Sequence, residues 1–371
     1  MRIAPALLAL ALAVLACGAP APAGGGPAAS AVPSADIKIS KLDITYTALA
    51  EQHYAKPSSK ALLEAALDSF RATAKAAGSN VAVPTPEFED KTEPLIPEFK
   101  KFADAAKRIA AATPQVSADR FADAAILAML AVKPDCHGYY RPRRTSAVPP
   151  SGESASAPGV PEAAPAAADE AGLEFRIIGG NVGYLTWKEF RRTGTYDIHV
   201  EVKKALDALL QQGAKAWLFD LRGNIGGEPP QTMTSWFLNG DKIMDIRSRT
   251  GSDGIQTARP ELRLPDAYQL PIAIVQNARG GSSPEVFTLG LKENKRATVV
   301  GSRSAGCLGS IYPLTLADGS FVAVPHAEFV GAITGARYNN AGIPPDVPAD
   351  DATAVDVATR LLQEQIAKGR P

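Results

Sequence analysis

The sequence predicts an α/β protein of the α+β type, in which a small helical domain precedes a mixed β-sheet core with flanking helices. Between residues 39 and 133, apolar side chains recur three and four positions apart, which is the periodicity of amphipathic helices. From residue 173 onward, short apolar runs typical of buried strands alternate with helical patterns. Asp318-Gly319 lies between two of these runs and predicts a hairpin.

Composition places the chain among ordinary globular proteins. It has 371 residues, of which 46% are hydrophobic, enough to bury a sizeable core. Lys plus Arg and Asp plus Glu both number 39, and aromatic residues are sparse. Without a basic excess, nucleic-acid binding is not expected.

The N-terminus is interpreted as a targeting segment. Met1-Arg2 precedes an Ala/Leu-rich run that is short for a membrane span and ends at Ala16-Cys17. This ending resembles the lipobox of bacterial lipoproteins, so residues 1–17 are expected to be a signal peptide with Cys17 lipidated. An ordinary secretory signal is the alternative. Residues 18–38 are then a flexible tether of mainly Ala, Gly and Pro.

Two domains are expected after the tether. Residues 39–143 form the helical domain, with helices over Leu42–Tyr54, Ala61–Ala77, Ile96–Ala111 and Asp119–Ala131. Residues 144–172 are a Pro/Ala-rich linker or loop. Residues 173–349 form the core, which opens with a hairpin around Gly179-Gly180, and residues 350–371 are a C-terminal helix and tail.

Within the core, Ser282 follows a buried strand and precedes a helical pattern that starts at Pro284. A serine on such a turn lies near a helix N-terminus, where backbone N–H groups favour negative charge and can stabilise an oxyanion. Ser282 is therefore a candidate nucleophile for attack on a carbonyl. The alternative is that Ser282 or Ser283 only caps the helix.

A second turn, Arg222 to Gly227, also follows an apolar strand. Its glycines allow the backbone to approach a ligand closely. It lacks the Lys-Ser/Thr ending of a phosphate-binding loop, so nucleotide binding is not expected.

Six motifs in the second half of the chain occur in the same order as in the C-terminal processing, or tail-specific, serine proteases, and the chain resembles that family. They are Val182-Gly183-Tyr184-Leu185, the turn Asp220 to Gly227, Ser282-Ser283-Pro284-Glu285, Arg296 to Gly301, Leu316 to Ser320, and Gly342 to Asp346. The helical segment that ends in Asp135-x-His137 is similar to a junction found in relatives. The resemblance covers most of residues 39–349 and implies a ClpP/crotonase-like core.

Carried over position by position, the resemblance implies roles for the two turns. Ser282 falls on the nucleophile. The oxyanion hole comes from the Ser283 backbone N–H and a glycine of the Gly226-Gly227 pair. The tail-specific branch places a lysine base twenty-five residues after its serine, and here that position is Cys307.

A second branch, which resembles the tricorn protease core, uses a histidine base from the junction that here holds His137. Histidine is suited to deprotonate a serine near neutral pH. The branch's carboxylate before the terminal motif appears here as Asn339 or Asn340, and asparagine can orient an imidazole. The alternative is that His137 only bonds to the backbone at the junction. His53, His199 and His326 are interpreted as structural.

The resemblance brings Cys136, next to the candidate base, and Cys307 to one rim of the active site. We expect them to form a disulfide that closes a loop of roughly 170 residues. Their Cα atoms must then lie within about 7 Å of each other. A reactive thiol at Cys307 is the alternative.

Together these features predict a lipid-anchored serine endopeptidase of the bacterial envelope, facing the periplasm or exterior. Its partner is a peptide or protein substrate, and no cofactor is expected. No metal is expected either, because the histidines show no metal-ligand spacing. Where relatives insert a substrate-gripping PDZ module, this chain has its Pro/Ala-rich stretch, so specificity is expected from the core's own groove. The alternative function is a non-catalytic relative that binds peptides or another ligand.

Overall fold

The computed structural model describes residues 34–143 and 170–369. The predicted signal peptide, Cys17, most of the tether and most of the 144–172 linker lie outside the described residues. No helix within the described ranges is long and apolar enough to cross a membrane.

The helical domain is built from amphipathic helices whose apolar faces meet in one core. Within residues 34–143, the helices are α1 Ser34–Gln52, α2 Ser59–Ala76, α3 Ile96–Ala111 and α4 Ala118–Leu130. Their apolar side chains, spaced three and four apart as predicted, are buried together. Ser58 and Ser117 cap α2 and α4, accepting hydrogen bonds from Ala61 N and Arg120 N.

The core is a mixed sheet of six strands within the described residues, in the order β11-β8-β7-β4-β3-β2. Its strands are β2 Glu174–Ile178, β3 Val182–Thr186, β4 Ala216–Asp220, β7 Ile272–Gln276, β8 Ala297–Gly301 and β11 Val347–Pro348. The β2–β3 hairpin is antiparallel as predicted, and the remaining neighbours are parallel.

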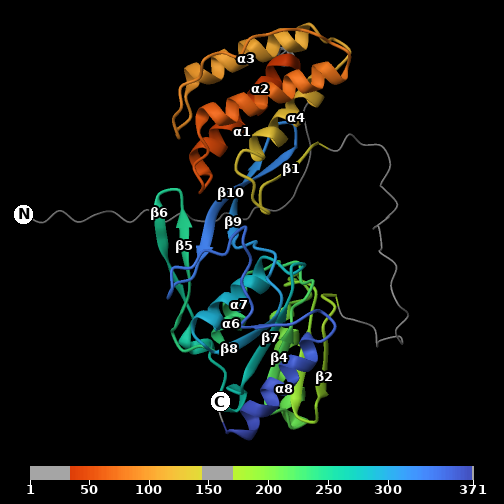
Figure 1. Ribbon diagram of the computed structural model, residues 1–371, viewed down its shortest axis with the longest axis vertical. Coiled ribbons are helices and arrows are strands. Elements are labelled where there is room, and N and C mark those ends of the chain that lie inside the picture. Colours follow the sequence, from red (N-terminus) through yellow and green to blue (C-terminus); the bar gives the residue numbers. More distant parts are fainter. Residues whose placement is uncertain (1–33, 144–169, 370–371) are drawn as a thin grey trace, which may run out of the picture.

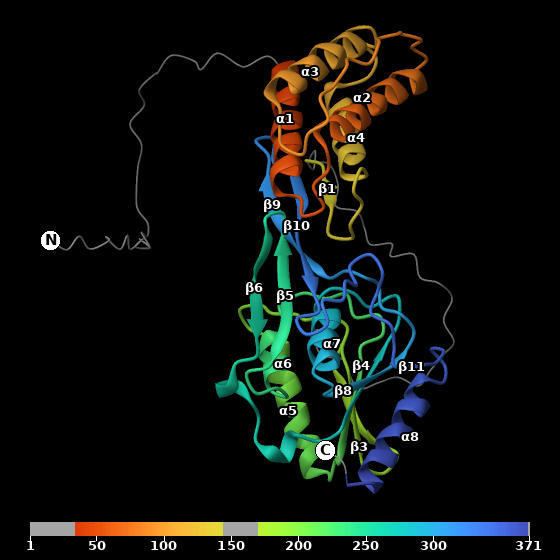
Figure 2. The same cartoon turned by 60° about the vertical axis from the view of Figure 1, so that its left-hand side comes forward.

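Helices cover both faces of this sheet, because successive residues of its strands point to opposite sides. In Figure 2, α5, α6 and α7 lie on one side of the sheet and α8 on the other. Trp217 and Phe219 of β4 belong to the apolar core on the first side, whereas Ala216 and Leu218 pack against α8. These helices are α5 Ile198–Gln211, α6 Gln231–Ser235, α7 Ser283–Glu293 and α8 Ala354–Ala367. The α/β core with flanking helices is therefore confirmed.

A second sheet joins the core to the helical domain (Figure 1). Its strands are β1 Tyr139–Arg141, β5 Lys242–Ser248, β6 Gly251–Thr257, β9 Gly309–Thr315 and β10 Phe321–Val330. Leu316, Val322 and Val324 complete the apolar core of the helical domain. The β9–β10 hairpin forms at Asp318-Gly319 as predicted.

Some elements differ from expectation. Strands β5 and β6 were not predicted, because β6 is exposed along most of its length and lacks an apolar alternation. The apolar spacing over Asp197–Gln211 predicts a helix with Val200 on its apolar side. The helix forms as α5, but its predicted apolar side is wrong at Val200, which is 49% exposed, whereas Val202 and Ala205 face the core. The sequence also predicts a helix over Pro229–Leu238, and the structure has only the shorter α6 there.

Candidate active site

Ser282 lies at the junction of β7 and α7. Its φ of 73° falls in the left-handed region, which is unusual for a residue with a side chain. Such strain persists where the surrounding structure imposes it and is frequent at functional sites. Ser282 occupies the N-cap position of α7, so the predicted cap and the predicted nucleophile are the same residue.

The two neighbouring serines have different surroundings. The Ser283 hydroxyl is buried and donates to the Gly227 carbonyl at 2.9 Å, which ties the two glycine-rich turns together. The Ser283 N–H lies in the first turn of α7, where backbone N–H groups lack an acceptor within the helix. Ser283 is thus positioned to offer its backbone N–H near Ser282.

Gly226 lies directly against the Ser282 side chain. A Cβ atom at Gly226 would be 2.7 Å from Ser282 Cβ and 3.0 Å from its Oγ, so no larger residue fits there. The Gly226 N–H donates to Asn224 Oδ1 at 2.9 Å and is therefore already bonded. Of the predicted glycine pair, Gly227 is the better candidate for an oxyanion donor.

A buried carboxylate, Glu285, organises the turn. Its Oε2 accepts from Ser282 N at 2.9 Å and from Cys307 N at 2.7 Å, and its Oε1 accepts from Gly306 N at 2.7 Å and from the Ser304 hydroxyl at 2.5 Å. Glu285 is 2% exposed. The loop that carries Cys307 is thereby held against the Ser282 turn.

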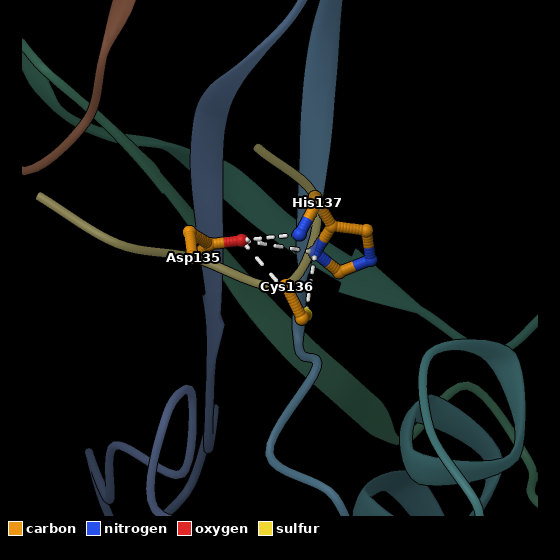
Figure 3. Close-up of side chains that lie close together, drawn as sticks. All are labelled: Asp135, Cys136 and His137. Carbon is orange, nitrogen blue, oxygen red and sulfur yellow. Dashed lines mark hydrogen bonds and ion pairs between the residues drawn. The ribbon is translucent and has the colours of Figure 1, made fainter. Parts of the chain in front are cut away.

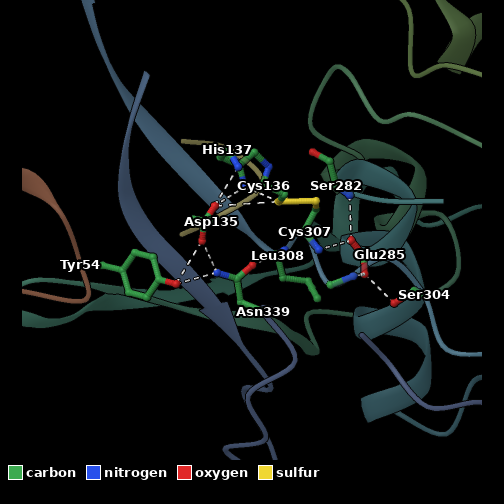
Figure 4. The surroundings of a disulfide bond; sticks show 11 residues. Tyr54, Asp135, Cys136, His137, Ser282, Glu285, Ser304, Cys307, Leu308 and Asn339 are labelled. Atoms are coloured by element: carbon green, nitrogen blue, oxygen red, sulfur yellow. Dashed lines mark hydrogen bonds and ion pairs between the residues drawn. A yellow bond between two sulfur atoms is a disulfide. The ribbon is translucent and has the colours of Figure 1, made fainter. Parts of the chain in front are cut away.

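Cys307 is linked to Cys136 by a disulfide (Figure 4). The Cα atoms lie 5.8 Å apart, below the limit stated above, and the two residues are 171 positions apart in the sequence. The bond joins the segment after α4 to the loop held by Glu285. His137 and Ser282 lie on the two sides of this disulfide in Figure 4.

Asp135 lies beside the imidazole of His137 (Figure 3). His137 Nδ1 is 3.3 Å from Asp135 Oδ1, which also accepts from the His137 backbone N–H at 2.8 Å. Burial by itself raises the pKa of Asp135, but hydrogen bonds from the His137 ring and backbone and from Asn339 hold the pKa at about 2. Asp135 is therefore ionised at neutral pH.

The other oxygen of Asp135 is held by two residues distant in sequence. Asn339 Nδ2 donates to Asp135 Oδ2 at 2.6 Å and to Tyr54 Oη at 2.8 Å, and Tyr54 Oη donates to Asp135 Oδ2 at 3.0 Å. Asn339 Oδ1 accepts from Leu308 N. Asn339 therefore contacts Asp135, and the carboxylate beside the imidazole is Asp135 itself.

Asp135, Cys136 and His137 also have the residue types of a metal site, with ligand atoms within 4.8 Å of one another. Cys136 is in a disulfide, so its sulfur is not a thiolate. A carboxylate and an imidazole remain, fewer than the three or four protein ligands of typical zinc sites. The cluster is therefore better suited to hold a proton than a metal ion.

The structure thus groups the predicted site residues around the disulfide. Ser282 lies on one side and His137 on the other in Figure 4. Gly226 packs against Ser282, and Ser283 bonds to Gly227, so these three residues belong to the Ser282 side. In the described part of the chain, no hydrogen bond joins the His137 ring to Ser282 Oγ; apo active sites often show such longer geometry.

Tyr54 and the bonding role of Glu285 were missed. The Glu285 role has a sequence signal, a glutamate three residues after the N-cap serine. Tyr54 has none, because it lies 81 positions before Asp135. Lys292, in the last turn of α7, forms a salt bridge with Asp346.

Comparison with known proteins places this geometry in a family context. Residues 181–349 match Peptidase family S41. The chain is 29% identical over 174 residues to the carboxy-terminal processing protease CtpA of Bacillus subtilis (strain 168), covering 46% of this chain and 35% of that protein. It is 31% identical over 155 residues to the carboxyl-terminal-processing protease of Synechocystis sp., covering 41% and 34%.

Among solved structures, the photosystem II D1 C-terminal processing protease aligns with a TM-score of 0.43 and 23% identity, covering 51% of this chain and 52% of that chain. The chain spans about a third of the length of these two curated relatives. The matched residues include the turn from Arg222 to Gly227, the Ser282 turn and Cys307. Residues 181–349 therefore form a Peptidase family S41 domain.

Proposed function

We propose that this protein is a serine endopeptidase that uses Ser282 as nucleophile and His137 as general base. One observation carries the proposal: Ser282 is held at a positive φ against Gly226, at the start of α7, with the His137–Asp135 pair across the disulfide. The S41 domain and the proteases among its relatives support the same conclusion.

In this mechanism, Asp135 sets the tautomer of His137. A proton on Nδ1 faces the ionised Asp135, which leaves Nε2 unprotonated to accept the proton of Ser282 Oγ. The serine oxygen then attacks the scissile carbonyl, and the N–H groups of Ser283 and Gly227 stabilise the oxyanion. His137 next protonates the leaving amine, and water hydrolyses the acyl-enzyme by the same route.

This assignment gives Asn339 a different role from the one expected from the sequence. Asp135 is the orienting carboxylate, and Asn339 with Tyr54 fixes its second oxygen. Asn339 is then a positioning residue that acts through Asp135, and its amide does not need to replace the carboxylate found in the tricorn-like branch.

The proposed place of action is the bacterial cell envelope, with Cys17 as the lipid anchor. The support is the lipobox-like ending of the apolar run, together with a cysteine pair suited to an oxidising compartment. Mass spectrometry of the membrane fraction tests this point: a diacylglyceryl group on Cys17 is expected, and Cys17→Ala should release the protein from the membrane.

The activity is tested by cleavage of a peptide library by protein that lacks residues 1–17. Ser282→Ala and His137→Ala should each reduce kcat by roughly 10⁴-fold or more. Ser302→Ala is the matched control, because Ser302 is exposed and its side chain makes no hydrogen bond to the site among the residues that the structure describes. Full activity in Ser282→Ala would contradict the proposal, and peptide binding without cleavage by any form would favour the non-catalytic alternative.

A further inference from the structure

Strand β9 leaves the candidate active site and has one free edge. It pairs with β10, and within the described residues no other strand lies beside it. Gly309 begins the strand, and a Cβ atom added to it would lie 3.5 Å from His137 Nδ1. Two residues earlier, Cys307 N–H donates to Glu285. The free edge is therefore continuous with the Ser282–His137 site.

Two prolines show which main-chain groups point outward from β9. Pro325 has no N–H, lies opposite Ile311, and directs its carbonyl away from β9, toward Tyr54 N. Ala323, opposite Pro313, pairs on its other side with β1. Because hydrogen-bonded and non-hydrogen-bonded pairs alternate in antiparallel sheets, Ile311, Pro313 and Thr315 direct their backbone groups to the free edge.

The outward groups match those of an extended peptide. Ile311 and Thr315 each offer an N–H and a C=O, and Pro313 offers only a C=O. An added strand hydrogen-bonds to such groups, and its side chains alternate between the two faces of the sheet. Pro313 also weakens pairing between copies of this edge, which disfavours a second copy as the occupant.

A cavity of about 260 Å³ lies beside β9, between this strand and α1. Its apolar walls include Ile44 and Tyr312, each 40% exposed. Asp43 and Glu51 also line it, and neither forms a salt bridge within the described residues. Burial without a compensating cation raises the pKa of Asp43. An apolar wall with two unpaired carboxylates is complementary to a Lys or Arg side chain.

We propose that the free edge of β9 binds the substrate as an extended strand and that the cavity between α1 and β9 selects a Lys or Arg side chain of that strand. This inference rests on the proposed function and adds its docking surface. With a rise of about 3.3 Å per residue, the cavity residue Tyr312 lies about 10 Å along the strand from Gly309. The selected residue is then about three positions from the scissile bond.

The first test removes one outward donor. Ile311→Pro deletes the outward N–H and leaves the pairing with β10 intact, as Pro313 already does two residues further on. Ile311→Ala is the matched control, because it shortens the side chain and keeps the donor. Ile311→Pro should raise KM for a Lys-containing peptide about tenfold relative to Ile311→Ala, as expected for one lost hydrogen bond.

The second test concerns the cavity. Peptides that differ only by Lys or Glu at each position are compared, and the wild type should prefer Lys about three positions from the cleaved bond. In Asp43→Asn/Glu51→Gln, this preference in kcat/KM should fall about fivefold. An unchanged preference, or one at a position next to the cleaved bond, would overturn the assignment of the cavity.

Labelling of Ser282 by a fluorophosphonate separates these tests from the proposed function, because the probe needs no peptide docking. If Ile311→Pro and wild type are labelled equally and have the same KM, the docking surface is overturned while the nucleophile stands.

If Ile311→Pro does not fold, N-methylation of single substrate amides replaces it. The proposal is overturned if N-methylation changes KM at none of the substrate positions. A wild-type dimer that Ile311→Pro converts to a monomer would show that the edge binds a second copy instead.

Discussion

Ser282 keeps its positive φ because glycines surround it. A Cβ atom at Gly280 would lie 2.8 Å from the Leu221 carbonyl, and one at Gly281 would lie 3.0 Å from Ala305 Cβ. A residue held in the left-handed region costs about 1–3 kcal/mol, which the surrounding contacts must offset. The close backbone packing at this turn therefore serves the placement of one hydroxyl.

Gly226 and Gly223 allow a matched test of this packing. Both have a positive φ, of 91° and 70°. A Cβ at Gly226 would meet Ser282, whereas a Cβ at Gly223 would have no described atom within 4 Å apart from those of its two chain neighbours. Gly226→Ala should reduce kcat/KM at least 100-fold, because Ser282 must move. Gly223→Ala should lose about 1–2 kcal/mol of stability and remain within about threefold of wild-type activity. Similar activities of the two variants would contradict the close approach, as measured by peptide cleavage.

At this scale, the sequence was sufficient for residues that belong to local motifs. Ser282, Ser283 and the glycine pair lie on strand-to-helix turns that a pattern can identify. The contacts of Asp135 could not be derived, because Asn339 lies 204 positions away from it and no local periodicity encodes such a contact. The sequence placed Asn339 near the base, and the structure shows which atom it bonds.

Two features attach the helical domain to the rest of the chain at the level of elements. One is the Cys136–Cys307 disulfide. The other is Lys41 of α1, which is 4% exposed and lies 3.1 Å from Asp318 in the β9–β10 hairpin and 2.7 Å from Asp123 in α4. Both features join segments far apart in sequence, and the disulfide lies at the site.

The disulfide should contribute measurably to stability. For a sequence separation of 171 residues, the chain-entropy model gives at most about 5 kcal/mol. Cys136→Ser/Cys307→Ser should therefore lower the free energy of unfolding by about 2–5 kcal/mol in urea titrations. Reductant should produce the same loss in the wild type and none in the double variant. A loss below about 1 kcal/mol would contradict the bond's structural role.

Elements with a clear period were predicted well. The helices of the N-terminal domain and the buried strands β4 and β7 follow their apolar spacing within a few residues, except that α1 begins earlier, at Ser34. Strands β5 and β6 form because they extend a sheet next to β10, a long-range pairing that their own residues do not indicate. Tertiary pairing overrides local propensity there.

For the whole molecule, the site is assembled from regions that are distant in the chain. The helical domain contributes Tyr54, the segment after α4 contributes Asp135 and His137, and the core contributes Ser282 and Glu285. Activity should therefore depend on docking of the helical domain onto the second sheet. The order of motifs in the sequence indicated this arrangement, whereas the hydrogen bonds within it are visible only in the structure.

Stability should decrease in acid through two buried carboxylates that attach distant segments. Asp135 and Asp318 both have a pKa lowered from 3.8 to about 2. Burial alone would raise each pKa, but the hydrogen bonds to each carboxylate outweigh that effect, and at Asp318 the charge of Lys41 lowers the pKa further. A carboxyl group whose pKa is lower in the folded than in the unfolded state stabilises the fold at any pH above its unfolded-state pKa. That contribution is lost as the pH falls through the folded-state pKa. Each group thus contributes about 2 kcal/mol, lost mainly between pH 4 and pH 2.

Urea unfolding at pH 5.5 and pH 2.5 checks this expectation. The wild type should lose more stability over this interval than Asp318→Asn, in which one of the two titrating groups is absent. Equal losses in the two proteins would show that Asp318 does not carry the pH dependence.

The central claim is that Ser282 is an activated nucleophile. Intact-mass analysis after incubation with a fluorophosphonate measures this directly, because the probe leaves a covalent adduct on an activated serine. We predict one adduct per chain, mapped to Ser282 by peptide sequencing, and none in Ser282→Ala or His137→Ala. An adduct that persists in Ser282→Ala, or no adduct on the folded wild-type protein, would contradict the account.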